Sequence, residues 1–241
     1  PVGLMGGEPY RIMELTPYVG ASKATSSVIL YVMMHIFSHF CFWFFSIFLY
    51  LALRPVDIAM GTILAVVGAV SLLAIYFFMK GYKNGMAVRT LKLLQHIPFV
   101  KEWAKRFSEN KREALERVDS QIAELHKQRR STFYASLSLE FMARIIGCLE
   151  VYFILNILTT DVSFPACILI MAFTSLFANL FFFSPMQLGA REGGFALAVG
   201  GLAIPGAFGV YTGLITRVRE LIWIVIGVLL MKVGNGTPAN K

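Results

Sequence analysis

The chain has 241 residues and a formal net charge of +8, from 22 Lys and Arg against 14 Asp and Glu. Its mean hydropathy is +0.67, and 57% of its residues are hydrophobic whereas 15% are charged. Because soluble domains carry about 25% charged residues, the composition excludes that class. It indicates an all-α, polytopic helical membrane protein.

The first distinctive segment, GGEPYR, ends at Arg11 and precedes an uncharged stretch. Its glycine pair, which includes Gly7, permits backbone torsions and close approaches that a side chain would prevent. Pro9 suits the first turn of a helix, so Glu8 takes a capping position and Arg11 lies one turn inside. A helix N-terminus favours phosphate, and the forked guanidinium matches phosphate geometry. The segment predicts a headgroup-binding helix start; the alternative is an interfacial loop with solvated charges.

Long apolar segments follow, and about 20 apolar residues are enough to span a bilayer. Within a single membrane domain over residues 1–241, spans are predicted at 26–53, 56–79, 131–159 and 163–183. Gly and Pro interrupt the last segment, residues 190–232. The segment can therefore be divided into helices in two ways. In one, a re-entrant half-helix before Pro205 is followed by one span at 207–231. In the other, 190–211 and 213–232 are two spans. We expect re-entrant or broken helices here.

The long hydrophilic segment, residues 80–130, carries 13 Lys and Arg against 6 Asp and Glu, a net charge of +7. Basic loops stay in the cytoplasm, so this loop is predicted to be cytoplasmic. Within it, MAVRTLKLLQHIPF has apolar residues at helical spacing and predicts an amphipathic helix on an anionic lipid surface. The interspersed acids and the adjacent spans argue against nucleic acid as a partner.

A second interrupted segment, SPMQLGAREGG, covers residues 184–194. It places Gly189, Arg191 and Glu192 before another apolar helix, so a glycine pair, a carboxylate and an arginine recur. Counting spans from the basic loop puts both interrupted segments on the cytoplasmic side. Paired Gly/Pro-interrupted segments are the best sequence indicator of a transporter's central site. Both segments are therefore candidate headgroup sites.

Charged residues inside the predicted spans are the remaining candidates. Such a residue costs about 2.5–3.5 kcal/mol on insertion scales, so it is rare and usually functional. Those predicted to line a polar translocation path are Glu140, Arg144, Glu150, Arg217 and Glu220, with Arg219 in the same cluster. Glu140 and Arg144 are four apart and can pair, whereas Glu150 has no local partner in the sequence. The alternative is a set of structural ion pairs that fix helix packing.

No residue pattern indicates a metal, a cofactor or catalysis. His35 and His39 have the i, i+4 spacing of a chelating pair, but no third ligand accompanies them. The three cysteines lie in apolar segments, which favours buried thiols. Without a phosphate-binding loop or a nucleophile motif, ATP hydrolysis is not expected. The chain is predicted not to be an enzyme.

The first segment resembles a signature of the lysylphosphatidylglycerol synthase transmembrane (flippase-like) family. Gly7, Glu8 and Arg11 match the Gly-Glu-x-x-Arg element of that family position by position. Family members are longer, with further spans before this element. We therefore expect the chain, which starts at Pro1, to correspond to the C-terminal two-thirds of a family member.

The second segment resembles the family's C-terminal signature, a Pro-Gly-Gly-x-Gly-x-x-Glu turn before a short helix, a break and an arginine-bearing last helix. Pro185, Gly189 and Glu192 match the turn, but Met186 and Gln187 replace the usual glycines. In the last helix, Arg217 corresponds to the family's late arginine. No segment corresponds to the soluble synthase domain, so the resemblance implies lipid transport without lipid synthesis.

The resulting hypothesis is a lipid translocase of the bacterial inner membrane that moves a phospholipid, an aminoacylated lipid or a glycolipid. The arginines of the two segments would hold the phosphate, and the glutamates would balance them or meet a cationic headgroup. Two other functions stay open. One is a non-catalytic membrane partner that docks a lipid-modifying enzyme through residues 80–130, and the other is an intramembrane enzyme acting on a headgroup.

Overall fold

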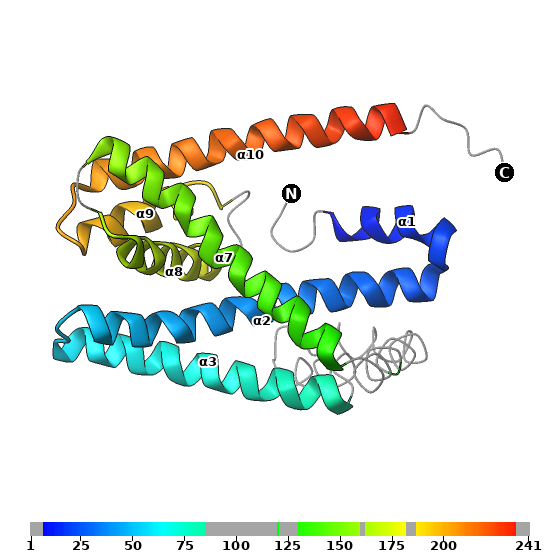
Figure 1. Cartoon of the computed structure of the whole chain (residues 1–241), viewed down its shortest axis with the longest axis horizontal. Helices are drawn as coiled ribbons and strands as arrows, with labels where there is room; N and C mark the ends of the chain where they lie inside the picture. The colour runs from blue at the N-terminus through cyan, green and yellow to red at the C-terminus, as the bar shows by residue number, and fades with distance from the viewer. Residues whose placement is uncertain (1–6, 85–119, 121–129, 160–161, 182–186, 235–241) are drawn as a thin grey trace. The chain divides into compact units, whose positions relative to one another are not determined.

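The computed structural model describes residues 7–84, 120, 130–159, 162–181 and 187–234. Within these ranges every regular element is a helix and no strand occurs, which confirms the predicted all-α class (Figure 1). The helices are α1 (Glu8–Val19), α2 (Ala21–Leu53), α3 (Ile58–Asn84), α7 (Arg130–Leu158), α8 (Phe164–Leu180), α9 (Ala190–Gly200) and α10 (Gly206–Gly234). Stretches of α2, α3 and α7 are long and apolar enough to cross a membrane. This is the architecture of a helical membrane protein.

The helix boundaries follow the apolar segments of the sequence. α2 covers the segment at 26–53, α3 begins two residues into the segment at 56–79, and α7 ends one residue before the end of the segment at 131–159. α8 has 17 residues, slightly fewer than the about 20 that a perpendicular span needs. In the last segment the helix breaks over residues 201–205, and α10 then runs without interruption through 211–213. The helices are therefore divided at Pro205.

Some predicted features lie outside the described residues. One is the basic segment at residues 80–130 with its expected amphipathic helix, since most of this segment falls in 85–119 and 121–129. The other is the backbone path at Met186.

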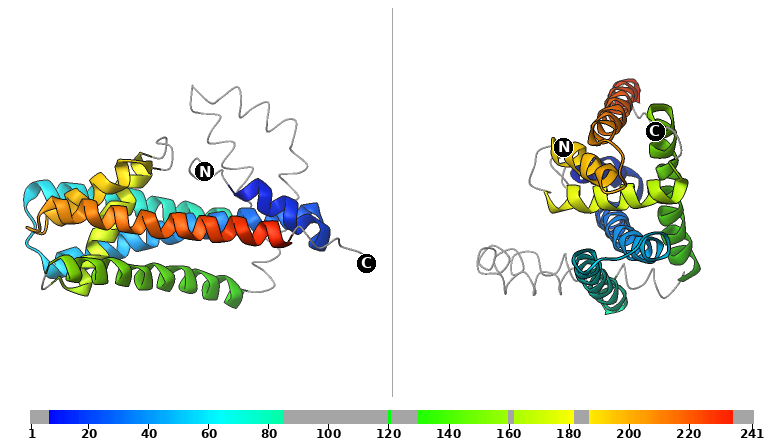
Figure 2. Two further views of the ribbon diagram at one scale, coloured as in Figure 1. Left: turned by 90° about the horizontal axis from the view of Figure 1, so that it is seen from above. Right: turned by 90° about the vertical axis from the view of Figure 1, so that its left-hand side faces the viewer.

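The chain divides into two compact units, Pro1–Gly147 and Cys148–Lys241. In the first unit, α2 and α3 lie side by side (Figures 1 and 2). Its core is formed by Met34, Phe37, Phe78 and Phe133, and the rings of Phe37 and Phe78 stack with centroids 4.2 Å apart. The short helix α1 packs on α2 and turns into it at Gly20, whose φ of +82° favours glycine.

In the second unit, α9 packs against both α8 and α10. Ser163 caps α8, because its hydroxyl accepts a hydrogen bond from the Ala166 amide at 3.4 Å. The core contains residues from α7, α8 and α9 and from the connection between α7 and α8, namely Val151, Leu155, Val162, Cys167, Ile170, Phe195 and Val199. This packing fixes the start of α9, which carries the second interrupted segment.

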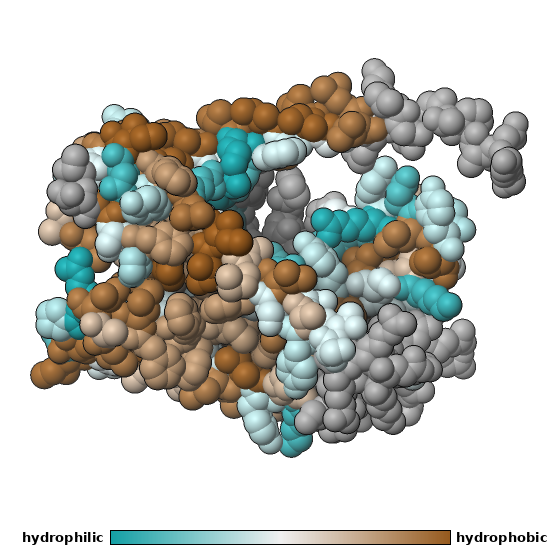
Figure 3. All heavy atoms as spheres, viewed as in Figure 1, coloured by the Kyte–Doolittle hydropathy of each residue, from teal (hydrophilic) through white to brown (hydrophobic). Residues whose placement is uncertain are grey.

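Residues 221–230 of α10 present apolar side chains on all sides. Every residue from Leu221 to Leu230 is exposed, and all except Gly227 are large hydrophobic residues. On the face shown in Figure 3, the surface of this part of the helix is hydrophobic. A helix that is apolar on all sides suits a hydrocarbon environment. The charged residues Arg217, Arg219 and Glu220 lie N-terminal to this stretch.

Candidate functional site

A line of glycines lets α10 approach the backbone of α9. A Cβ atom built at Gly209 would lie 2.5 Å from the Phe195 carbonyl oxygen, and one at Gly213 would lie 3.2 Å from the Cα of Glu192. Small residues at a helix interface permit such approaches in membrane proteins. The contact places the first turn of α9 directly against the middle of α10. Glu192 of α9 therefore faces Arg217 of α10.

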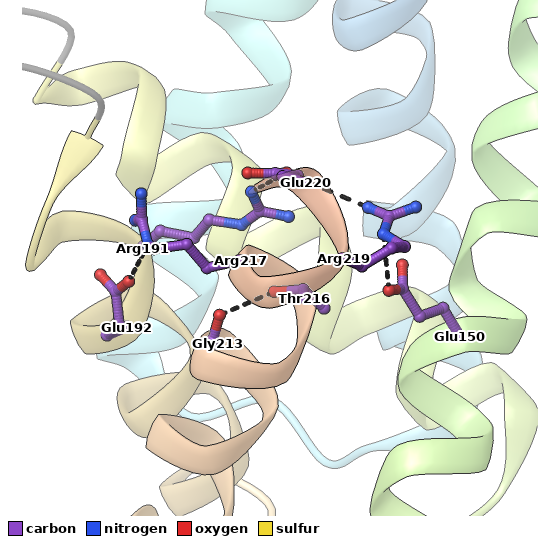
Figure 4. Close-up of polar contacts among 8 residues, drawn as sticks. All are labelled: Glu150, Arg191, Glu192, Gly213, Thr216, Arg217, Arg219 and Glu220. Carbon is purple, nitrogen blue, oxygen red and sulfur yellow. Dashed lines mark hydrogen bonds and ion pairs between the residues drawn. The ribbon is translucent and has the colours of Figure 1, made fainter. Parts of the chain in front are cut away.

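Glu192 and Arg217 form the most enclosed ion pair of the described part of the second unit (Figure 4). Arg217 Nε donates to Glu192 Oε1 at 2.7 Å, and the Arg217 and Glu192 side chains are 13% and 15% exposed. The other carboxylate oxygen, Oε2, accepts from the Gly189 amide at 2.9 Å. Both oxygens of the carboxylate are thus hydrogen-bonded. The Glu192 side chain caps α9 and at the same time binds α10.

Four further charged side chains form a second chain of contacts on α7, α9 and α10 (Figure 4). Arg191 Nη1 donates to Glu220 Oε1. The same oxygen lies 4.0 Å from Arg219 Nη2, and Arg219 Nε lies 2.9 Å from Glu150 Oε1. Together with the Glu192–Arg217 pair, three arginines face three glutamates. We call these six residues, Glu150, Arg191, Glu192, Arg217, Arg219 and Glu220, the Arg–Glu network.

The Arg–Glu network unites two groups of residues that the sequence treats separately. Arg191 and Glu192 were predicted to bind a headgroup, with Gly189 beside them, whereas Glu150, Arg217 and Glu220 were predicted to line a path. The structure also gives Glu150 the partner that its local sequence lacks, Arg219 of α10. Arg219 was predicted in the same cluster as Arg217 and Glu220 but was not named among the residues of the path. The signal for it was its position two residues after Arg217.

The headgroup residues of the first segment start α1 in the other unit. Gly7 precedes α1, and its amide donates to the Glu8 carboxylate at 3.2 Å. The guanidinium carbon of Arg11 lies 4.8 Å from the centroid of the Tyr31 ring on α2, a cation–π contact. Arg11 is thereby directed toward the polar face of α2.

Glu140 and Arg144 of α7 also meet α2. Arg144 Nε donates to the Ser38 hydroxyl at 2.7 Å, and Arg144 Nη1 lies 3.1 Å from His39 Nδ1. His35 Nδ1 lies 3.5 Å from Glu140 Oε2. The two histidines that the sequence suggested as a chelating pair therefore contact an arginine. Among the described residues no group of three or more His, Cys, Asp or Glu could hold a metal ion.

The turn before α9 uses left-handed backbone at two positions. Gly189 has a φ of +78° and Gln187 a φ of +53°. The second value matters because the family signature carries glycine at this position. The left-handed path is thus kept at Gln187, although a side chain disfavours it by about 1–2 kcal/mol.

Replacing Gly189 by alanine is expected to lower the free energy of unfolding by roughly 1–2 kcal/mol, since the new Cβ disfavours the φ of +78°. Gly200→Ala is the matched control at the other end of the same helix, because its φ is not left-handed and a Cβ there meets nothing within 4 Å. Unfolding in detergent micelles measures both. Equal effects of the two substitutions would show that the turn does not depend on the torsion of Gly189.

The comparisons with known proteins identify one family. The family model described as Lysylphosphatidylglycerol synthase TM region matches residues 1–227 of the chain. No curated protein and no solved structure matches.

Proposed function

The chain belongs to the family of the lysylphosphatidylglycerol synthase TM region, and from this premise we propose that it translocates a lipid across the bacterial inner membrane. The proposed cargo is a phospholipid, an aminoacylated lipid or a glycolipid. The proposal is transport without covalent chemistry, so the chain acts as a transporter and not as an enzyme.

The observation that carries the proposal is the Arg–Glu network. Charged residues placed among apolar helices are costly, about 2.5–3.5 kcal/mol each at the centre of a span. A purely structural ion pair can often be replaced by apolar side chains without loss of stability. Six charges in two neighbouring sets of contacts, on α7, α9 and α10, are therefore better explained as a polar surface along which a headgroup moves through hydrocarbon.

The contacts of the network suggest how a headgroup binds. Arg191 holds Glu220, which also lies 4.0 Å from Arg219. A lipid phosphate competes with Glu220 for these two guanidinium groups, and guanidinium groups match phosphate oxygens in a bidentate way. The released Glu220 then meets an ammonium group of the lipid, where one is present. Arg219 and Glu220 suit this exchange because their side chains are 49% and 39% exposed.

The helix lengths define the proposed topology of this region. α9 has 11 residues, which span about 16 Å at 1.5 Å per residue, roughly half of the hydrocarbon thickness. We infer that α9 is a re-entrant half-helix and that α10 crosses the bilayer. The basic 80–130 loop then lies in the cytoplasm against anionic lipid, with the headgroup site opening on the same side.

Replacing Arg191 by alanine is expected to abolish selective lipid retention while the protein still folds. Arg191 contacts Glu220, and in the variant the Glu220 carboxylate keeps Arg219 Nη2 at 4.0 Å, so it is not left without a positive partner. Native mass spectrometry of gently purified protein identifies the lipids retained by the wild type and by the variant. Arg191→Lys is the control, since lysine keeps the charge but loses the planar fork, and we expect partial retention.

A lipid class retained by the wild type and lost by Arg191→Ala would identify the cargo. Equal and unselective retention in both proteins would contradict a headgroup site at Arg191. It would instead favour a membrane partner that docks another protein.

A further inference from the structure

His35 lies between a hydrogen-bond donor and a hydrogen-bond acceptor in the first unit. Its Nδ1 atom is 3.4 Å from Arg144 Nη2 and 3.5 Å from Glu140 Oε2. Both distances exceed the roughly 2.7–3.2 Å that is usual for a hydrogen bond from N–H. The ring thus stands nearly midway between the two side chains. Nδ1 is therefore almost equally far from a donor and an acceptor.

The two partners demand opposite states of the same nitrogen. Arg144 can only donate, so it binds Nδ1 when that atom carries a lone pair. Glu140 as a carboxylate can only accept, so it binds Nδ1 when that atom carries a proton. When His35 gains a proton, Arg144 Nη2 keeps its bond to the His35 carbonyl oxygen at 2.9 Å. Protonation therefore exchanges one contact and leaves the arginine anchored.

Other charged and titratable groups around His35 influence the balance between its neutral and its protonated state. On α2, the Tyr31 ring stacks on His35 at 6.2 Å and the His39 ring meets it edge-on at 5.2 Å. On α1, Arg11 lies over Tyr31, and its positive charge, like that of Arg144, repels a positive charge on His35. Glu140 favours that charge. The His35 and Glu140 side chains are 43% and 27% exposed, so neither is sealed inside the first unit.

We propose that His35 and Glu140 form the binding site for a proton that is transported together with the lipid. The inference rests on the proposed lipid translocation and names its coupling ion. His35 lies near the middle of α2, Glu140 lies in the first half of α7, and Arg144 lies at its middle. Both helices are predicted spans. The proton enters as H⁺ on His35 Nδ1, forms the imidazolium–carboxylate pair, and leaves again as H⁺ on the other side.

The contact of Arg11 with Tyr31 gives this site a link to the cargo. A lipid phosphate bound by Arg11 offsets the positive charge that opposes protonation of His35. By reciprocity, a proton on His35 and a phosphate on Arg11 then strengthen each other's binding. The two therefore bind and move in the same direction, which makes the transport a symport.

The test uses the purified full chain in vesicles of phosphatidylethanolamine and phosphatidylglycerol, with an acyl-labelled phosphatidylglycerol as probe. A pH gradient is imposed while potassium and valinomycin clamp the membrane potential, and chemical bleaching of the outer leaflet gives the leaflet ratio. With one proton per lipid, a gradient of about one pH unit supports a ratio of up to about tenfold. We expect the probe to accumulate in the leaflet facing the alkaline side.

His35→Gln and Glu140→Gln each remove one half of the proposed site, and both should move the probe only to an equal ratio. Two separate variants keep the test valid if one of them does not fold. His39→Gln is the matched control, since His39 contacts Arg144 and was given no role in carrying the proton. It should keep the accumulation even if movement slows.

Movement of the probe without any response to the gradient, or accumulation on the acidic side, would overturn the inference and leave the proposed function standing. So would a His35→Gln variant that accumulates the probe as the wild type does. A wild type that moves no probe would contradict the proposed function as well.

Discussion

Replacing Arg217 by alanine is expected to lower the free energy of unfolding by roughly 3 kcal/mol and to stop lipid movement. Its Nε lies 2.7 Å from Glu192 Oε1, and both side chains are largely enclosed. Removing one member of a buried pair costs about 3–5 kcal/mol, because it leaves an uncompensated charge. The remaining exposure of the pair places the expected loss at the lower end. Unfolding in detergent micelles measures the stability.

The double variant Glu192→Gln/Arg217→Met separates structure from function. It leaves no uncompensated charge, and the oxygen of the new side-chain amide at position 192 can still accept from the Gly189 amide. Stability should therefore return to within about 1 kcal/mol of the wild type, while lipid movement stays absent. Recovery of both stability and movement would mean that the pair only fixes helix packing, which is the alternative interpretation of these charges.

Replacing Gly209 by alanine is expected to have the second largest effect, a loss of about 1–3 kcal/mol with reduced lipid movement. The new Cβ would lie 2.5 Å from the Phe195 carbonyl oxygen and 2.7 Å from the Cα of Ala196. Both atoms are backbone, so neither can rotate away and the helices must separate. Overpacking of this kind costs about 1–3 kcal/mol. Separation would also draw Arg217 away from Glu192.

Gly227→Ala is the matched control on the same helix. A Cβ at Gly227 meets nothing within 4 Å, and alanine favours a helix over glycine by about 0.8–1 kcal/mol. We expect unchanged or slightly higher thermal stability in detergent. A Gly209→Ala variant as stable as Gly227→Ala would contradict the close α9–α10 contact.

The helical class and the long helices could be predicted because they depend on local composition. An apolar stretch as long as residues 26–53 has few options other than a helix in a membrane. The break before α10 was also visible as one of two divisions, since Pro205 cannot continue a helix without losing a hydrogen bond. These features need no knowledge of which helices touch.

The partners of the charged residues could not be predicted, because they join helices far apart in the sequence. Spacing along one helix suggested Glu140 with Arg144 and a shared face for Arg217 and Glu220. In the structure, Arg217 forms an ion pair with Glu192, and Arg191 forms one with Glu220. Only the packing of α9 on α10 creates these pairs. The repeated glycines at the start of α10 could have indicated that packing.

For the first segment, GGEPYR, the start of a helix could be predicted but its contacts with other helices could not. Local rules predicted Glu8 at the capping position, but Gly7 is the N-cap of α1 and Glu8 is its first helical residue. The contact of Arg11 with Tyr31 depends on how α1 folds back at Gly20. The i, i+4 spacing of the two histidines on α2 could also be read from the sequence. The arginine that they contact belongs to α7, and the sequence did not indicate that contact.

In the proposed function, the chain moves lipid by means of the Arg–Glu network. The most direct measurement is the initial rate at which acyl-labelled phosphatidylglycerol, its lysyl ester and a glycosylated diacylglycerol cross vesicles that contain the purified wild type or Arg191→Ala. We predict that the wild type moves at least one of these probes faster than protein-free vesicles do, and that Arg191→Ala does not. Equal rates in wild-type and protein-free vesicles for all three probes, or equal rates in the two proteins, would contradict the claim.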